Sequence, residues 1–168
     1  MTEVNDQTDP FGADGEEAQS AAARYKQYVT FMVGDRAYGV DIVQVREIKQ
    51  WSPTTGLPNQ PHYTRGVLNL RGTIVPVHDL RARFGGALTE ATETHVVVIV
   101  WIGDQTVGVL VDAVSDIVTV SVDDIRPVPD SSPEADVSSI SGLVNTEDHM
   151  VALLDLVNLF GTQRDFAA

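Results

Sequence analysis

Short apolar runs separated by turn residues follow one another along the chain from residue 27 onward. Residues 28–33 are rich in aromatic and β-branched side chains, Gly34-Asp35-Arg36 forms a turn signal, and residues 37–42 return as a second apolar run. This order predicts a β-hairpin. Further runs of the same kind predict three more strands, at 43–48, 66–70 and 73–78.

One short helix interrupts this pattern of strands. The segment 79–84 begins with Asp79, a favourable N-cap residue, and is followed by Gly85, a favourable stop. Residues 51–63 contain three prolines and are expected to form a loop.

The sequence then repeats itself. Residues 34–48 match 103–117 at an offset of 69, and residues 66–85 match 142–161 at an offset of 76. Each copy supplies about five strands and a short helix, in roughly 60–75 residues, which is a marginal size for a separate core. We therefore expect an all-β fold of two barrels with a groove between them, in which the approximate halves 25–88 and 89–163 are either separate or interleaved.

Composition and charge narrow the class of protein. The 168 residues suit one domain or two small ones, and the absence of cysteine excludes disulfides, zinc–thiolate sites and cysteine nucleophiles. No apolar run is long enough to cross a membrane, and no signal peptide is visible. The net charge of -13 argues against nucleic acid and against an anionic lipid surface as partners. Residues 1–24, with six acids before a lone arginine, are expected to be a disordered tail, as are 164–168.

Signatures of catalysis and of metal or cofactor binding are missing from the sequence. The four histidines are not at metal-ligand spacing, and there is no pair of Asp-Thr-Gly or Asp-Ser-Gly triplets. Nor is there a serine-protease context, a phosphate-binding loop or a dinucleotide fingerprint. We therefore predict no catalytic residue, no metal and no cofactor.

Two opposite charges stand out among the apolar strands. Glu47 lies in the run 43–48, and Arg71 follows the run 66–70 at a turn. Their counterparts in the second copy are Asp116 and Glu147, so the copies differ in charge at matched positions. An exposed ion pair contributes little stability. We therefore interpret Glu47 and Arg71 as an ion pair that shapes a binding face, the alternative being ordinary solvated side chains.

Longer strings of the sequence resemble one known family. YGVDIVQVREI, GVLNLRGTIVPVHDLRARFG and VGVLVDAVSDIV, with the IRP that follows, are similar to the CheW family of chemotaxis coupling proteins, over about residues 27–161. The resemblance implies two five-stranded barrels of the Src-homology-3-like type. It also implies a cytoplasmic, non-enzymatic adaptor that joins the cytoplasmic tips of chemoreceptors to the regulatory domain of the histidine kinase CheA in membrane-associated arrays.

The resemblance also assigns a receptor-binding groove. Its residues would be Val45, Glu47, Gly66, Val97 and Gly108, and Arg71 would pair with Glu47 to support the surface. Plain core packing remains the alternative for the two valines, and a strand bend or bulge for the two glycines. Two other functions stay open: a coupling protein of a pilus or other non-flagellar chemosensory cluster, and a small-ligand sensor that uses the groove between the barrels.

Overall fold

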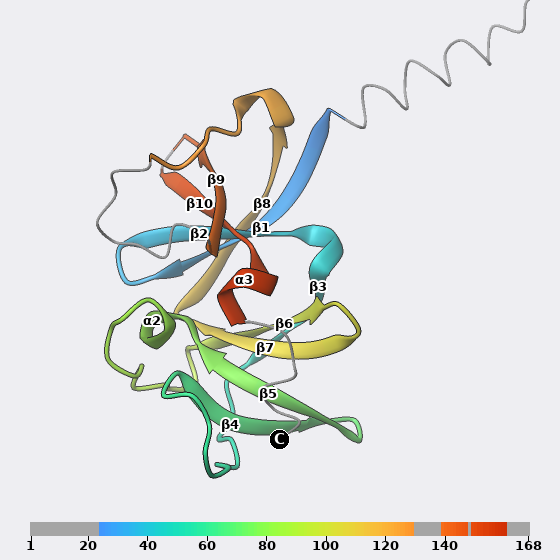
Figure 1. Cartoon of the computed structure of the whole chain (residues 1–168), viewed down its shortest axis with the longest axis vertical. Coiled ribbons are helices and arrows are strands. Elements are labelled where there is room, and N and C mark those ends of the chain that lie inside the picture. The colour runs from blue at the N-terminus through green and yellow to red at the C-terminus, as the bar shows by residue number, and fades with distance from the viewer. Residues whose placement is uncertain (1–23, 130–138, 148, 161–168) are drawn as a thin grey trace, which may run out of the picture.

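The computed structural model describes residues 24–129, 139–147 and 149–160. The predicted tails, 1–24 apart from Arg24 and 164–168, lie outside these residues. Two five-stranded sheets lie one above the other, with helix α3 between them (Figure 1). In chain order the elements are β1 (Tyr25–Val33), β2 (Arg36–Asp41), η1 (Ile42–Gln44), β3 (Val45–Gln50), β4 (Thr64–Leu70), β5 (Thr73–Asp79), α2 (Leu80–Arg83), β6 (Val96–Ile102), β7 (Gln105–Val111), β8 (Ala113–Ser121), η2 (Val122–Asp124), β9 (Ile140–Asn145), β10 (Met150–Leu154) and α3 (Leu156–Phe160).

The sheets do not follow the two copies of the repeat. Sheet A has the strand order β8-β1-β2-β10-β9, and sheet B has the order β3-β6-β7-β5-β4. Each sheet therefore combines the first hairpin of one copy with the last three strands of the other. Parallel contacts join the contributions, β2 with β10 in sheet A and β5 with β7 in sheet B.

The predicted hairpin is confirmed, with Val33 opposite Arg36 across the turn. The prediction that the next strand begins at Val43 is wrong, because residues Ile42–Gln44 form a 3₁₀ turn. The Asp41 side chain caps this turn by accepting a hydrogen bond from the Val43 amide at 3.1 Å. An apolar run can therefore begin with a capped turn, which carries the chain from sheet A to sheet B.

The predicted short helix is also confirmed. Asp79 caps α2 by accepting hydrogen bonds from the amides of Arg81 and Ala82, at 3.1 and 3.4 Å. Gly85 follows the helix with a φ of 94°, which a glycine adopts without strain.

Among the residues that the structure describes, buried side chains form three groups. One lies within sheet B and includes Val77, Val97 and Ile99. A second belongs to sheet A, and the third and largest combines strands of both sheets with the two helices. On β6, Val97 and Ile99 belong to the core of sheet B, while Val98 and Val100 belong to the shared core. The continuous apolar run 96–100 thus buries both of its faces, as a strand between two cores requires.

Candidate functional site

An ion pair joins the two ends of sheet B. Arg71, at the turn between β4 and β5, donates a hydrogen bond from Nη2 to Oε2 of Glu47 on β3. β3 and β4 are the two edge strands of this sheet. The ion pair therefore connects the two edges between which the sheet curls towards a closed barrel. The predicted pairing of these two side chains is therefore present in the structure.

Arg71 occupies a backbone position that an arginine rarely takes. Leu70 pairs with Thr73, so Arg71 and Gly72 form a two-residue turn, with φ angles of 50° and 88°. The Asn69 side chain supports the turn by accepting a hydrogen bond from the Gly72 amide at 2.8 Å. Glycine or asparagine usually occupies such positions, because other side chains strain the backbone there. An arginine at this position points to a role for its side chain.

The carboxylate of Glu47 is held in its charged form. The hydrogen bond from Arg71 is the main cause that lowers the Glu47 pKa below its ordinary value, and the positive charges of Arg71, Lys49 and Arg46 act in the same direction. Arg71 is two-thirds exposed and Glu47 is about one-quarter exposed, so the pair is open to solvent. The turn therefore presents a fixed pair of opposite charges at the surface.

Three of the predicted groove residues lie in one row across sheet B. Glu47 pairs with Ile99, Ile99 with Gly108, Gly108 with Val77, and Val77 with Gly66. The row crosses all five strands, and its interior members are buried. Only Glu47, on the end strand, reaches the surface.

An equivalent row crosses sheet A. It runs from Asp116 through Thr30, Gly39 and Leu153 to Gly142. The glycines occur at the same places in both rows, Gly39 matching Gly108 and Gly142 matching Gly66. Glycines in both copies are best explained by the needs of the barrel, whereas the charged pair is found in one copy alone.

Close packing explains the two glycines of sheet B. A Cβ atom on Gly66 would lie 2.4 Å from the carbonyl oxygen of Thr55, whose segment bridges to β4 through Val67. A Cβ atom on Gly108 would lie 2.8 Å from Cγ1 of Val97.

The other two predicted groove residues are also packed against neighbours. Val97 is fully buried in the core of sheet B, and Val45, partly buried, packs against the shared core. Of the five predicted groove residues, Glu47 and Val45 are thus the two with exposed surface, and the other three shape the sheet from within.

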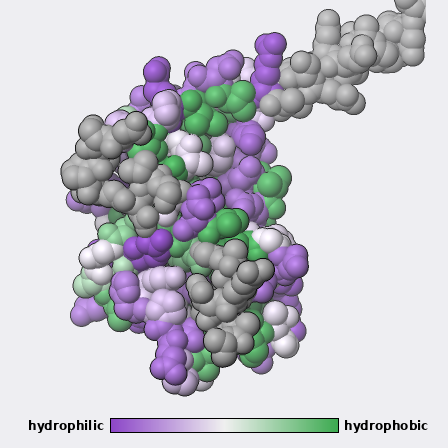
Figure 2. All heavy atoms as spheres, in the orientation of Figure 1, coloured by the Kyte–Doolittle hydropathy of each residue, from purple (hydrophilic) through white to green (hydrophobic). Residues whose placement is uncertain are grey.

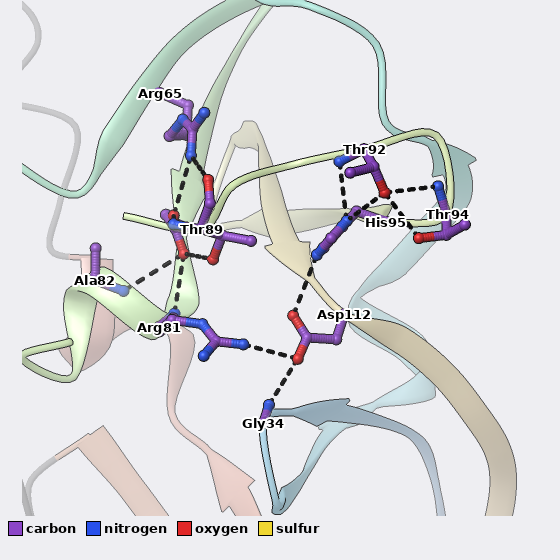
Figure 3. Close-up of polar contacts among 10 residues, drawn as sticks. Gly34, Arg65, Arg81, Ala82, Thr89, Thr92, Thr94, His95 and Asp112 are labelled. Carbon is purple, nitrogen blue, oxygen red and sulfur yellow. Dashed lines mark hydrogen bonds and ion pairs between the residues drawn. The ribbon is translucent and has the colours of Figure 1, made fainter. Parts of the chain in front are cut away.

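A second set of polar contacts, which the sequence analysis missed, joins the two sheets (Figure 3). Asp112 follows β7 and accepts hydrogen bonds from the Gly34 amide at 2.7 Å and from Nη2 of Arg81 at 2.8 Å. His95 Nε2 lies 3.5 Å from the same carboxylate. The first-hairpin turn of sheet A is thereby tied to helix α2. The one signal for this contact in the sequence was Asp112, a single acid directly after the apolar run 107–111.

A cavity of about 980 Å³ opens beside this contact, between β2, β9, β10 and α2. Its lining combines apolar side chains with three arginines and Asp35. The residues are Val33, Asp35, Arg36, Ala37, Tyr38, Arg81, Arg83, Phe84, Gly85, Gly86, Val128, Pro129, Ile140, Leu143, His149, Met150 and Ala152.

Hydrophilic residues cover much of the face seen in Figure 2, with hydrophobic residues in separate small groups. Within the described ranges no helix is long and apolar enough to cross a membrane. The same residues contain no cluster of three or more histidine or acidic side chains that could hold a metal ion.

Two interleaved five-stranded barrels, with a surface ion pair in one of them, define a double-barrel scaffold. The CheW-like domain matches residues 27–164, and the chain belongs to this family. It is 41% identical to the chemotaxis protein CheW of Rhizobium meliloti over 85% of this chain and 92% of the relative. It is 33% identical to that of Klebsiella aerogenes over 82% and 83%. The crystal structure of the scaffolding protein TtCheW from Thermoanaerobacter tengcongensis matches with a TM-score of 0.75 and 33% identity, over 82% of this chain and 88% of that one.

Proposed function

We propose that this chemotaxis scaffold protein couples chemoreceptors to the histidine kinase CheA, and that it does so without catalysis. Through it, receptors in membrane-associated arrays on the cytoplasmic side would control kinase autophosphorylation. Its partners would be the receptor tips and the regulatory domain of the kinase. Family membership supports this function.

The observation that carries the assignment of the receptor-binding face is the pair Glu47–Arg71. Its arginine is two-thirds exposed and lies at a backbone turn that would favour a different residue, and the other copy of the repeat lacks the pair. The partly exposed Val45 lies two residues away on the same end strand. A receptor segment would meet a fixed charge pair beside an apolar strand edge, while Gly66, Val97 and Gly108 keep that sheet closely packed.

A reconstituted array tests the proposal. Receptor signalling fragments on a membrane mimic are combined with the kinase, and autophosphorylation is followed with and without this protein. We expect a large rise that needs the protein. Arg71→Glu should lower the rise about tenfold, because it places two acids together, while binding to the isolated kinase regulatory domain stays unchanged.

Two further variants make the test specific. Glu47→Arg combined with Arg71→Glu restores opposite charges and should recover part of the activation. Glu147→Arg changes the matched position of the second copy and should behave like the unaltered protein. Normal activation by Arg71→Glu would show that the receptor binds elsewhere. No rise with the unaltered protein, together with no binding to the kinase domain, would contradict the coupling function itself.

A further inference from the structure

The contact around Asp112 lies where the chain passes from one sheet to the other. Asp112 alone separates β7 of sheet B from β8 of sheet A. Its carboxylate holds the Gly34 amide in the first hairpin of sheet A and Nη2 of Arg81 in helix α2, while His95 approaches it from the segment before β6 (Figure 3). One side chain thus meets three separate parts of the fold.

The repeat shows that the barrel does not require this contact. The residue matched to Asp112 in the first copy is Val43, which lies at the other crossing between the sheets and is 79% exposed. The residue matched to Arg81 in the second copy is Val157. The acid and its arginine are therefore specific to this one junction rather than to the fold.

Hydrogen bonds connect the same junction to β3, the edge strand of sheet B that contributes to the proposed receptor-binding face. At the end of β3, Gln50 Nε2 donates to the carbonyl of Glu93 at 2.7 Å, and the Trp51 amide donates to the carbonyl of His95 at 2.9 Å. His95 therefore has its backbone fixed to the end of β3 and its ring beside the carboxylate of Asp112. A displacement of β3 would move this ring relative to the carboxylate.

The ring of His95 points a donor at Asp112 without closing the contact. The Thr92 amide donates to Nδ1 of His95 at 3.0 Å, so the proton of the neutral ring is on Nε2. Nε2 lies 3.5 Å from Oδ1 of Asp112, and within the described part of the chain this buried oxygen has no hydrogen bond. A shift of about 0.6 Å would bring the two atoms to the usual N···O distance of about 2.9 Å.

We propose that this contact is a conformational link through which β3 acts on sheet A, with Asp112 as its positioning residue. The inference rests on the proposed function, because β3 carries Glu47 of the receptor-binding face. When a receptor segment binds there, β3 and the His95 ring shift together, the contact closes, and the carboxylate turns relative to Gly34 and helix α2. Such a link requires an element with two arrangements that binding can bias, and the open and closed contact supplies them.

Solution NMR on the full chain tests the link without the kinase. The Gly34 amide, held by Asp112 at 2.7 Å, reports on the carboxylate from the other sheet. Adding the receptor signalling fragment should shift the Gly34 amide signal. At the same receptor occupancy, His95→Ala should reduce that shift several-fold, whereas His149→Ala, at an exposed histidine between β9 and β10, should leave it unchanged.

The reconstituted array gives a second readout, the ratio of kinase activities without and with a receptor stimulus. Asp112→Ala should lower this ratio several-fold and leave the affinities for the receptor fragment and the kinase regulatory domain unchanged. Asp155→Ala is the control for lost stability, because the Asp155 side chain accepts a hydrogen bond from the Asn158 amide within helix α3, and it should keep the ratio. Adding His95→Ala to Asp112→Ala should lower the ratio no further, since both break the same link.

The outcomes separate this link from the proposed function. If Asp112→Ala disturbs folding, Asp112→Asn keeps an oxygen that can accept from Gly34, removes the charge that faces Arg81 and His95, and should still lower the ratio. An unmoved Gly34 signal at receptor saturation, an unchanged ratio in the Asp112 variants, or effects of the Asp112 and His95 variants that add would each overturn the link. Failure of the unaltered protein to bind the receptor fragment would contradict the proposed function, and the link with it.

Discussion

At the scale of single residues, comparing matched positions of the two repeat copies separates residues that the barrel requires from residues that it does not. Positions that are alike in both copies, such as Gly39 and Gly108, serve the barrel. Positions that differ, such as Arg71 and Glu147, are free to serve something else. The charged pair could be singled out in the sequence because its counterparts in the second copy, Asp116 and Glu147, are both acidic. The burial of Val97 was not, because the apolar run 96–100 does not indicate which of its two faces meets the partner.

The buried residue His78 should make the free energy of unfolding depend on pH. His78 is fully buried, stacks on Phe160 at a centroid distance of 4.7 Å, and shares a hydrogen bond with Thr64 Oγ1 at 3.0 Å. Burial, and secondarily the charge of Arg83, lowers the His78 pKa from 6.5 to about 4. The unfolded chain therefore takes up this proton first as the pH falls.

We accordingly expect the contribution of His78 to stability to be complete above pH 6.5 and to be lost progressively towards pH 4. The loss in the free energy of unfolding should approach roughly 3 kcal/mol. Denaturant unfolding at a series of pH values measures it. His78→Phe should flatten the decline between pH 6.5 and 4, whereas His149→Gln, at an exposed histidine, should not. An equally steep decline in His78→Phe would assign the pH dependence to other groups.

At the scale of elements, turn chemistry made the strands and helix α2 predictable. Asp79 and Gly85 marked the ends of the helix correctly, because capping depends on residues that are close in sequence. The 3₁₀ turn at Ile42–Gln44 was missed, since its residues are as apolar as those of a strand. Capping and turn preferences do not indicate which sheet edge a loop will contact. The loop 51–63 is an example, because Thr55 forms a β-bridge with Val67 on the edge strand β4.

Substitution of one glycine tests that bridge. Gly66→Ala would bring a Cβ atom against the Thr55 carbonyl at a φ of 126°, so the loop must move off β4. We expect the free energy of unfolding to fall by more than about 2 kcal/mol. Gly56→Ala, in the same loop with open space around it, is the control and should be nearly neutral. Equal stability of the two variants, measured by thermal or denaturant unfolding, would contradict the close packing described for β4.

At the scale of the whole molecule, each barrel is built from strands of both repeat copies. The repeat is visible in the sequence, but separate and interleaved halves are equally compatible with it, because an apolar strand pattern does not specify its partner strand. In the structure, each sheet needs strands from both copies. Family membership, which the strings of sequence indicated, agrees with the fold of the scaffolding protein TtCheW.

Separated halves test this arrangement. Fragments 25–88 and 89–168 each lack strands that both sheets need, so we expect neither to unfold cooperatively on its own. Mixing them should restore β-sheet circular dichroism and a cooperative transition, because the fragments are complementary. A cooperative transition in either fragment alone would contradict the interdependence of the copies.

The interleaving also sets an order of events during synthesis on the ribosome. All strands of sheet B lie within residues 45–111, a continuous stretch that can pair as soon as it emerges. The hairpin β1–β2 is made first, yet it must wait for β10, which ends at Leu154. At about 5–20 residues per second, the delay from Asp41 to Leu154 is roughly 6–23 s. For that time β2 lacks its partner strand β10, and a nascent chain with such an unpaired strand edge is the form most exposed to aggregation and to chaperones.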